Sequence, residues 1–242
     1  MPHRESELVR SDSRPKQEFG DEADLPGGLP DAETAASMEG VFWLFSLLLR
    51  YPGEEVYLRL RENSRLLKQL LGDATFRAPE LSDPQEVQAE YVRLMVNNYG
   101  QIPAVPYASC YLNEEGLLME SVHREIVQLM RGEGKEPKQD IGEPADHIYL
   151  LLEFCAEMAG AIRRKESGGR KYCAMRTVIC RYIAPMAERF CQDLEKHARQ
   201  DFYRSVALAF RDFIREMRPL WEGGCESVNT CEQEDSLCHP CL

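Results

Sequence analysis

Apolar residues recur every three to four positions from Met38 to about Leu220, which is the spacing that places them on one face of an α-helix. Between residues 54 and 72, this spacing is kept by Val56, Leu60, Leu67, Leu70 and Leu71. No stretch of the sequence alternates apolar and polar residues in the way that a half-buried strand requires. The pattern therefore predicts an all-α fold, a single-domain bundle of about seven or eight helices.

Capping residues and prolines divide this pattern into separate helices. Asp83 followed by Pro84 predicts an N-cap and a first helical residue, and Pro185 predicts a break or kink in a long helical stretch. Two segments interrupt the helical pattern: a proline-containing loop over residues 98–113 and a polar segment over residues 132–142. Long loops within compact domains often carry function, so both segments are candidates for binding.

The two ends of the chain differ from the helical part. Residues 1–37 are polar, rich in acid, glycine and proline, and without periodicity, which predicts a disordered N-terminal tail. Residues 221–242 form an acidic, cysteine-rich C-terminal tail. The predicted organisation is therefore a helical domain over residues 38–220 between two tails.

The C-terminal tail contains a candidate metal site. Cys238 and Cys241 have the C-x-x-C spacing that lets two thiolates share one metal ion, and Cys225 and Cys231 precede them. The remaining intervals match no standard zinc finger or ferredoxin pattern. Two interpretations stay open, a metal site with zinc preferred over iron–sulfur, and a flexible tail with free thiols.

The other cysteines have simpler interpretations. Cys155, Cys173, Cys180 and Cys191 lie on predicted helices, where small core residues are expected. Cys110 lies in the proline-containing loop, and the sequence leaves its role open.

The chain is acidic, with 41 Asp and Glu against 29 Lys and Arg and a formal net charge of −12. Such a charge provides no long-range attraction to nucleic acids or anionic membranes, and it favours a basic peptide as partner. No apolar run reaches the length of a membrane span, and the first residues lead into no signal-peptide core. The sequence therefore predicts a soluble cytoplasmic protein, in which free thiols or metal ligands are expected rather than disulfides.

An Asp-His pair stands out in the stretch GEPADHIYLLLEF, residues 142–154. Pro144 suits the first position of a helix, which makes Glu143 the expected N-cap and Asp146 an acceptor for amides of the first turn. This structural role explains Asp146 and leaves His147 unexplained. The pair is therefore a candidate cap, metal ligand, recognition site or catalytic dyad.

A catalytic interpretation requires a nucleophile beside His147, and Ser109 and Cys110 are the candidates. Neither residue lies in a known nucleophile signature, and no glycine-rich phosphate loop is present. A Ser or Cys hydrolase and a metal-binding or redox-sensing regulator remain as alternative functions. The regulator would depend on the tail cysteines alone.

Taken together and in order, several blocks resemble the TorD/DmsD family of redox-enzyme maturation chaperones. The block EYVRLMVNNYGQIPAVPYASCYLNEEGLLM is similar to the family's core, in which a helix leads into a Pro-aromatic-x-Ser-x-Tyr loop. The block EPADHIYLLLEFCAEM resembles the family's Glu-Pro-x-Asp-His signature, and APMAERFCQDLEKHARQDFYRSVALAFRDFI resembles its closing helices. The resemblance covers about residues 38–220 and says nothing of the two tails. Met95 departs from the family's usual Phe, and Ala108 and Cys110 flank the loop serine where other residues are common.

The resemblance implies an all-helical cytoplasmic chaperone, not an enzyme, that requires no cofactor. Its implied partners are the catalytic subunit of a molybdopterin-containing oxidoreductase and the twin-arginine leader peptide of that subunit, which the chaperone holds until the molybdenum cofactor is inserted. It is expected as a monomer or a helix-exchanged dimer. The residues carried over as client-binding are Tyr91, Leu94, Met95, Pro106, Tyr107, Ser109, Tyr111, Glu143, Pro144, Asp146 and His147.

These residues suggest a physical mode of recognition. Leader arginines would bind the carboxylates of Glu143 and Asp146 through charge-assisted hydrogen bonds. The apolar part of the leader would bind a groove lined by Tyr91, Leu94 and Met95, together with Tyr107. His147 is expected to orient the acid, because a neutral histidine donates one hydrogen bond and accepts another.

Overall fold

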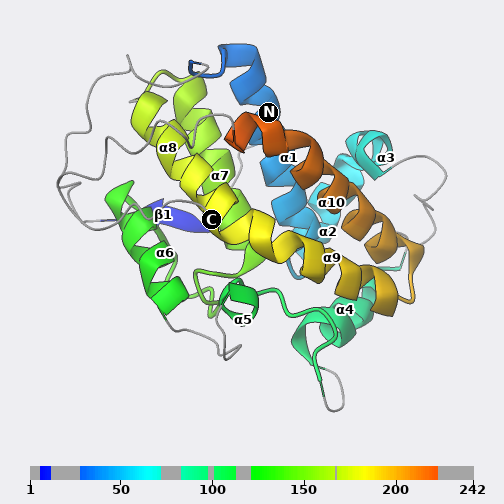
Figure 1. The fold of residues 1–242 in the computed structure, drawn as a ribbon. Coiled ribbons are helices and arrows are strands. Elements are labelled where there is room, and N and C mark those ends of the chain that lie inside the picture. The colour runs from blue at the N-terminus through cyan, green and yellow to red at the C-terminus, as the bar shows by residue number, and fades with distance from the viewer. Residues whose placement is uncertain are drawn as a thin grey trace.

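Helix α7 (Ile148–Arg163) runs through the middle of the molecule (Figure 1). In the computed structural model, which describes residues 6–11, 28–71, 83–97, 101–112, 121–166 and 168–222, this helix is buried nearly all round. Its longest contact is with α1 (Ala32–Leu48), and α8 (Gly168–Val178) packs on another side. An apolar helix of this kind needs partners on every face, which explains its central place.

Helices α9 (Ala184–His197) and α10 (Asp201–Glu222) pack against each other beside this centre (Figure 1). Aromatic rings join α10 to α1: the ring centroids of Phe45 and Phe210 lie 5.0 Å apart, and those of Phe42 and Phe213 lie 5.4 Å apart. Such tilted and edge-on ring pairs stabilise a core beyond the area they bury. The predicted all-α bundle is confirmed.

The remaining elements are short. They are α2 (Glu54–Glu62), α3 (Ser64–Leu71), α4 (Pro84–Tyr91), α5 (Ser109–Leu112), α6 (Ser121–Gly132), the π-helical turns η3 (Val92–Val96) and η4 (Ile179–Ile183), and the strands β1 (Leu8–Arg10) and β2 (Lys135–Pro137). Among the helices of the described residues, none has the length and hydropathy needed to cross a membrane.

The predicted capping and proline effects are present. The Asp83 carboxylate accepts hydrogen bonds from the amides of Gln85, at 2.9 Å, and Glu86, at 3.3 Å, and Pro84 opens α4. Before Pro185 the chain widens into η4 and then continues as α9. Proline has no amide hydrogen and its ring crowds the preceding turn, which accounts for the local change of helix type.

One predicted helix is divided in two. The apolar spacing over residues 54–72 continues across Asn63, yet α2 ends at Glu62 and α3 begins at Ser64. The Asn63 side chain donates to the Arg59 carbonyl at 2.8 Å. An asparagine that bonds its own backbone competes with the helical ladder, so the helix ends there.

The prediction of disorder over residues 1–37 is wrong for the described parts of that range. Leu8–Arg10 forms β1, antiparallel to β2, and α1 begins at Ala32, with the Asp31 carboxylate capping the Thr34 amide at 2.8 Å. The partner of β1 lies more than 120 residues away, so no local periodicity reveals this strand. Leu8, only 4% exposed, supplies the apolar contact that holds it.

The cysteines on helices differ in their surroundings. Cys155 and Cys191 are buried, as expected for small core residues. Cys180 is half-buried, and Cys173 is exposed, so the expectation of a core role is wrong for Cys173. Residue spacing shows that a position is helical but does not show which neighbouring helix covers it.

Candidate functional site

The proline-containing loop and the Asp-His segment form one junction. Residues 106–109 run antiparallel to residues 146–148, with Tyr107 bridged to His147. The Ala108 amide donates to the Asp146 carbonyl at 3.0 Å, and the Ile148 amide donates to the Pro106 carbonyl at 2.8 Å. The backbone itself therefore joins the two segments that the family resemblance singles out.

The Asp146 side chain holds this junction together from inside. It is 0% exposed, and its Oδ2 accepts hydrogen bonds from the Ser109 amide at 3.0 Å and from the Ser109 hydroxyl at 2.5 Å. Its Oδ1 lies 3.4 Å from Nδ1 of His123 on α6. A buried carboxylate needs such partners, because leaving it without hydrogen bonds is unfavourable by several kcal/mol.

The predicted helix start is wrong by several residues. Glu143 is not the N-cap and Asp146 does not bind the first turn, because α7 begins at Ile148 and His147 is its N-cap. Nδ1 of His147 accepts a hydrogen bond from the Tyr149 amide at 3.3 Å. The pairing of residues 146–148 with the loop keeps this segment extended and delays the helix, an effect that no local capping pattern contains.

His147 is neutral and enclosed by aromatic rings. Its ring centroid lies 5.1 Å from that of Tyr107 and 4.6 Å from that of Tyr149, and the residue is 1% exposed. Burial, with a smaller effect from the nearby Arg50 cation, lowers the pKa of His147 to about 3. With Nδ1 acting as acceptor, the ring proton is on Nε2. The predicted role in orienting Asp146 is replaced by a capping role.

Only part of the predicted client-binding site is accessible to solvent. Tyr107, Tyr111, Glu143 and Pro144 are half-buried. The Tyr107 hydroxyl donates to Oε2 of Glu143 at 2.8 Å, and burial together with this carboxylate raises the pKa of the Tyr107 phenol. Arg189 of α9 lies over the Tyr111 ring, 5.6 Å from its centroid. Glu143 is thus a carboxylate at the surface whose position is set by a tyrosine.

The predicted apolar groove is part of the core. Tyr91 is 3% exposed, Leu94 0% and Met95 1%, and Pro106 is also buried. The Tyr91 hydroxyl lies 3.5 Å from the Leu49 carbonyl, and burial raises the pKa of this phenol well above its usual range. These residues shape the site from beneath, because the Ala104 amide bonds the Leu94 carbonyl at 2.9 Å and ties the loop to η3.

The loop nucleophiles are unsuited to catalysis. Ser109 is 0% exposed and its hydroxyl donates to Asp146, so it is not activated by His147. Burial, and to a smaller degree the Asp146 charge, raises the pKa of the Cys110 thiol, which lowers its thiolate fraction. Both observations count against the hydrolase alternative.

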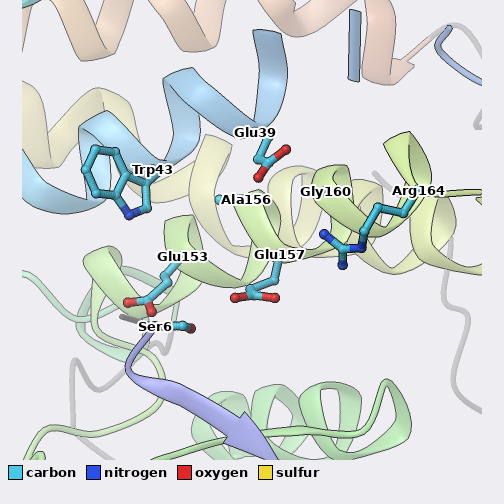
Figure 2. A pocket seen from close by; sticks show the side chains of 8 residues that line it. All are labelled: Ser6, Glu39, Trp43, Glu153, Ala156, Glu157, Gly160 and Arg164. Atoms are coloured by element: carbon cyan, nitrogen blue, oxygen red, sulfur yellow. The ribbon is translucent and has the colours of Figure 1, made fainter. Parts of the chain in front are cut away.

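The sequence did not reveal a hollow further along α7, between this helix and α1. It has a volume of about 190 Å³ and is lined by Ser6, Glu39, Trp43, Glu153, Ala156, Glu157, Gly160 and Arg164. Figure 2 shows the carboxylates of Glu39, Glu153 and Glu157 around one space between α1 and α7, with Ser6 near Glu153. Glu153 and Glu157 are four residues apart on α7, a spacing visible in the sequence, whereas Glu39 is brought in by α1.

Basic side chains surround this acidic hollow. Nζ of Lys135 lies 2.9 Å from Oε2 of Glu157, and Nε of Arg163 lies 2.8 Å from Oε2 of Glu39. Burial raises the pKa of Glu153, which is 4% exposed. A Cβ added at Gly160 would lie 3.2 Å from the Glu39 side chain and 3.1 Å from that of Arg164, so the glycine allows both to approach α7.

The four tail cysteines proposed as metal ligands lie outside the described residues. Within the described parts of the chain, no group of three or more His, Cys, Asp or Glu side chains is arranged to hold a metal ion. The possible zinc or iron–sulfur site therefore remains a prediction about the tail.

Comparison with known families identifies the class. The family model described as nitrate reductase delta subunit matches residues 55–192, which is more than half of the chain. The chain belongs to this family. Curated relatives that the chain matches are named chaperones.

Two curated relatives and one solved structure illustrate the similarity. The "Chaperone protein TorD" of Vibrio parahaemolyticus is 28% identical over 143 residues, which cover 57% of this chain and 65% of that protein. The protein of the same name from Ferrimonas balearica is 23% identical over 219 residues, covering 84% and 97%. A crystal structure from Archaeoglobus fulgidus, provisionally named a redox enzyme maturation protein, has a TM-score of 0.51 at 24% identity and covers 74% of this chain and 94% of its own. The structural likeness supports the fold.

Proposed function

We propose that this protein is a cytoplasmic chaperone that matures a molybdopterin-containing oxidoreductase. It binds the apo-enzyme, its twin-arginine leader peptide or both, and it releases them after the molybdenum cofactor has been inserted and before export. Family membership is the observation that carries this proposal, because the matched region includes both segments of the junction. The names of the curated relatives support the chaperone role.

We place the contact with leader arginines at Glu143 rather than at Asp146. Asp146 is buried and its Oδ2 already accepts two hydrogen bonds from Ser109. Glu143 is half-buried, and the Tyr107 hydroxyl holds one of its oxygens. A carboxylate fixed in this way is a rigid acceptor for a guanidinium group.

The apolar part of a leader requires a surface that the buried Tyr91, Leu94 and Met95 do not offer. Exposed apolar side chains lie next to them in the chain: Val92 is 36% exposed and Val96 50%. Tyr51 is 46% exposed, and its ring lies 5.6 Å from that of Tyr91. We propose these three residues as the apolar contact for the leader.

The test is the affinity for a synthetic twin-arginine peptide, measured by fluorescence anisotropy. Glu143→Gln is expected to weaken binding roughly tenfold, as loss of one charge-assisted hydrogen bond would. Glu55→Gln on α2, an exposed carboxylate, is the matched control and should bind as the wild type does. Equal affinity of the Glu143→Gln variant and the wild type would show that the arginine contact is misassigned.

If no leader peptide binds, a separate measurement still tests the maturation role. Co-expression of a client oxidoreductase with and without this protein would report on cofactor insertion through enzyme activity. The same client activity in both cultures would contradict the proposed function.

A further inference from the structure

Strand β1 pairs with β2 along its whole length and also contacts α7, and the space that it fills between these two elements is termed the groove. The pairs Leu8–Pro137, Val9–Glu136 and Arg10–Lys135 set an antiparallel register. The ladder extends past the strand at both ends, since the Lys138 amide donates to the Glu7 carbonyl at 2.9 Å and the Ser11 amide donates to the Gly134 carbonyl at 3.0 Å. Gly134 has a positive φ of 72°, which lets the chain turn sharply between α6 and β2.

The side chains of this segment are recognised as those of a bound peptide would be. Leu8 is inserted into the core and is 4% exposed, while Val9 points outward and is 37% exposed. Glu7 forms ion pairs with Arg50 and with Lys138, the latter at 3.7 Å. The Glu7 amide donates to Oε1 of the buried Glu153. Backbone pairing with alternate side-chain pockets is the usual mode of peptide addition to a sheet edge.

The groove is connected to the junction through Arg50. The guanidinium carbon of Arg50 lies 5.3 Å from the centroid of the Tyr149 ring, and Tyr149 packs on His147. If another group replaced Glu7 as the partner of Arg50, the replacement would therefore occur close to the N-terminus of α7.

The attachment of β1 depends on pairing with one other strand and on the side chains of Glu7 and Leu8. An isolated two-stranded ribbon is marginally stable in water, so Leu8 and the Glu7 ion pairs account for much of the attachment. A competing segment that supplies the same groups could replace it.

We propose that the groove between β2 and α7 is a second client-binding surface, which takes an extended peptide segment by strand addition to β2, and that residues 6–11 are its internal occupant. The partner is a client segment with an acidic residue followed by an aliphatic one, as in Glu7-Leu8. The acid binds Arg50 and Lys138, the aliphatic side chain fills the Leu8 pocket, and the backbone pairs with β2. This specificity is opposite in charge to that of a twin-arginine leader, so the surface does not depend on leader binding.

The test uses the full chain and a fluorescein-labelled peptide of residues 5–11 as probe. The double substitution Glu7→Lys with Leu8→Asp removes both anchors of the internal segment. This variant is expected to bind the probe at least tenfold more tightly than the wild type does, because its groove is no longer occupied in cis. Val9→Thr, which changes the outward-facing side chain of the same strand, is the matched control and should bind as weakly as the wild type.

Two further arms test the chemistry of the groove. A probe carrying Leu8→Asp is expected not to bind the double variant. Adding Lys138→Glu to the double variant should weaken binding of the normal probe, and a probe carrying Glu7→Lys should restore it. If the double variant loses its helical circular dichroism, Glu7→Lys alone serves in its place, with a smaller expected gain of about threefold.

Three results would overturn the proposal. The first is that the wild type and the anchor variants bind the probe with the same affinity. The second is that the double variant binds the Leu8→Asp probe as tightly as the normal probe. The third is that the probe and a twin-arginine peptide compete for one site.

Discussion

The start and the middle of α7 use acidic side chains in opposite ways. At its N-terminus, Asp146 is fully buried and accepts two hydrogen bonds from Ser109, so its carboxylate is part of the structure. Along its length, Glu157 lines a hollow and is paired with Lys135, and both side chains are half-buried with access to water. Removing the buried acceptor leaves donors without partners, whereas removing the surface acceptor exposes a lysine to water.

This difference changes the meaning of the Asp-His motif. A residue pair that looked suited to contact a ligand instead joins a loop to a helix start, and the accessible groups lie around it. The surfaces that we propose for client binding are Glu143 with Tyr107, the apolar residues near Tyr91, and the groove that β1 occupies. The buried Asp-His motif thus holds the proposed binding surface in place and is not itself that surface.

The largest expected effect separates these two kinds of carboxylate. Asp146→Ala should lower the free energy of unfolding by about 3 kcal/mol, because the Ser109 amide and hydroxyl lose their acceptor inside the protein. Glu157→Ala should lower it by about 0.5 kcal/mol or less. Urea titrations followed by circular dichroism measure both values, and similar losses in the two variants would refute the distinction.

The next effect concerns the pH dependence of stability. The pKa of His147 falls from 6.5 to about 3 in the folded state, so the unfolded chain binds a proton first as the pH decreases. The free energy of unfolding is therefore not reduced by this group above about pH 6.5. It decreases progressively toward pH 3, by about 2 kcal/mol between pH 7 and pH 5, as His147 of the unfolded chain takes up its proton.

His147→Asn tests this dependence, because asparagine keeps an N-cap acceptor and does not titrate. Its unfolding free energy should change less between pH 7 and pH 5 than that of the wild type. The comparison is made within this interval because carboxylates titrate mainly below it. Parallel curves for the two proteins would exclude His147 as the source.

A smaller effect is expected from loosening the N-terminal strand. Leu8→Ala should lower stability by about 1–2 kcal/mol, below the usual range for a buried leucine because the strand can detach without opening the rest of the core. Hydrogen exchange should become faster at the Lys138 amide, which bonds Glu7, and stay unchanged at amides of α7. Faster exchange in both places would mean that β1 is an integral part of the core.

A further small effect is expected at the surface of the junction. Tyr107→Phe removes the hydrogen bond to Glu143 and should lower stability by about 0.5–1 kcal/mol, because the hydroxyl is only partly buried. The same variant should weaken binding of a twin-arginine peptide less than Glu143→Gln does, since the carboxylate remains but is held less firmly. A Tyr107→Phe variant that binds more weakly than Glu143→Gln would reverse the assigned roles.

Much of the fold could be predicted from particular residues. The apolar spacing after Met38, the cap at Asp83 and the break at Pro185 depend on local sequence, and each has its structural counterpart. The ordered motif blocks also led to the family, which the match over residues 55–192 confirms. The predicted start of α7 was wrong because the loop at residues 106–109 pairs with residues 146–148, and this pairing competes with helix formation.

The sequence by itself determined which segments are helical, where prolines and capping residues end them, and that the loop and the Asp-His segment belong together, because these features depend on neighbouring residues or on an ordered set of motifs. The tertiary structure decided which polar groups are buried. It enclosed Asp146 and His147, left Glu143 accessible, brought Glu39 to Glu157, and placed β1 beside β2. Burial depends on contacts between residues far apart in the chain, so spacing alone does not show whether a carboxylate stabilises the fold or faces a partner.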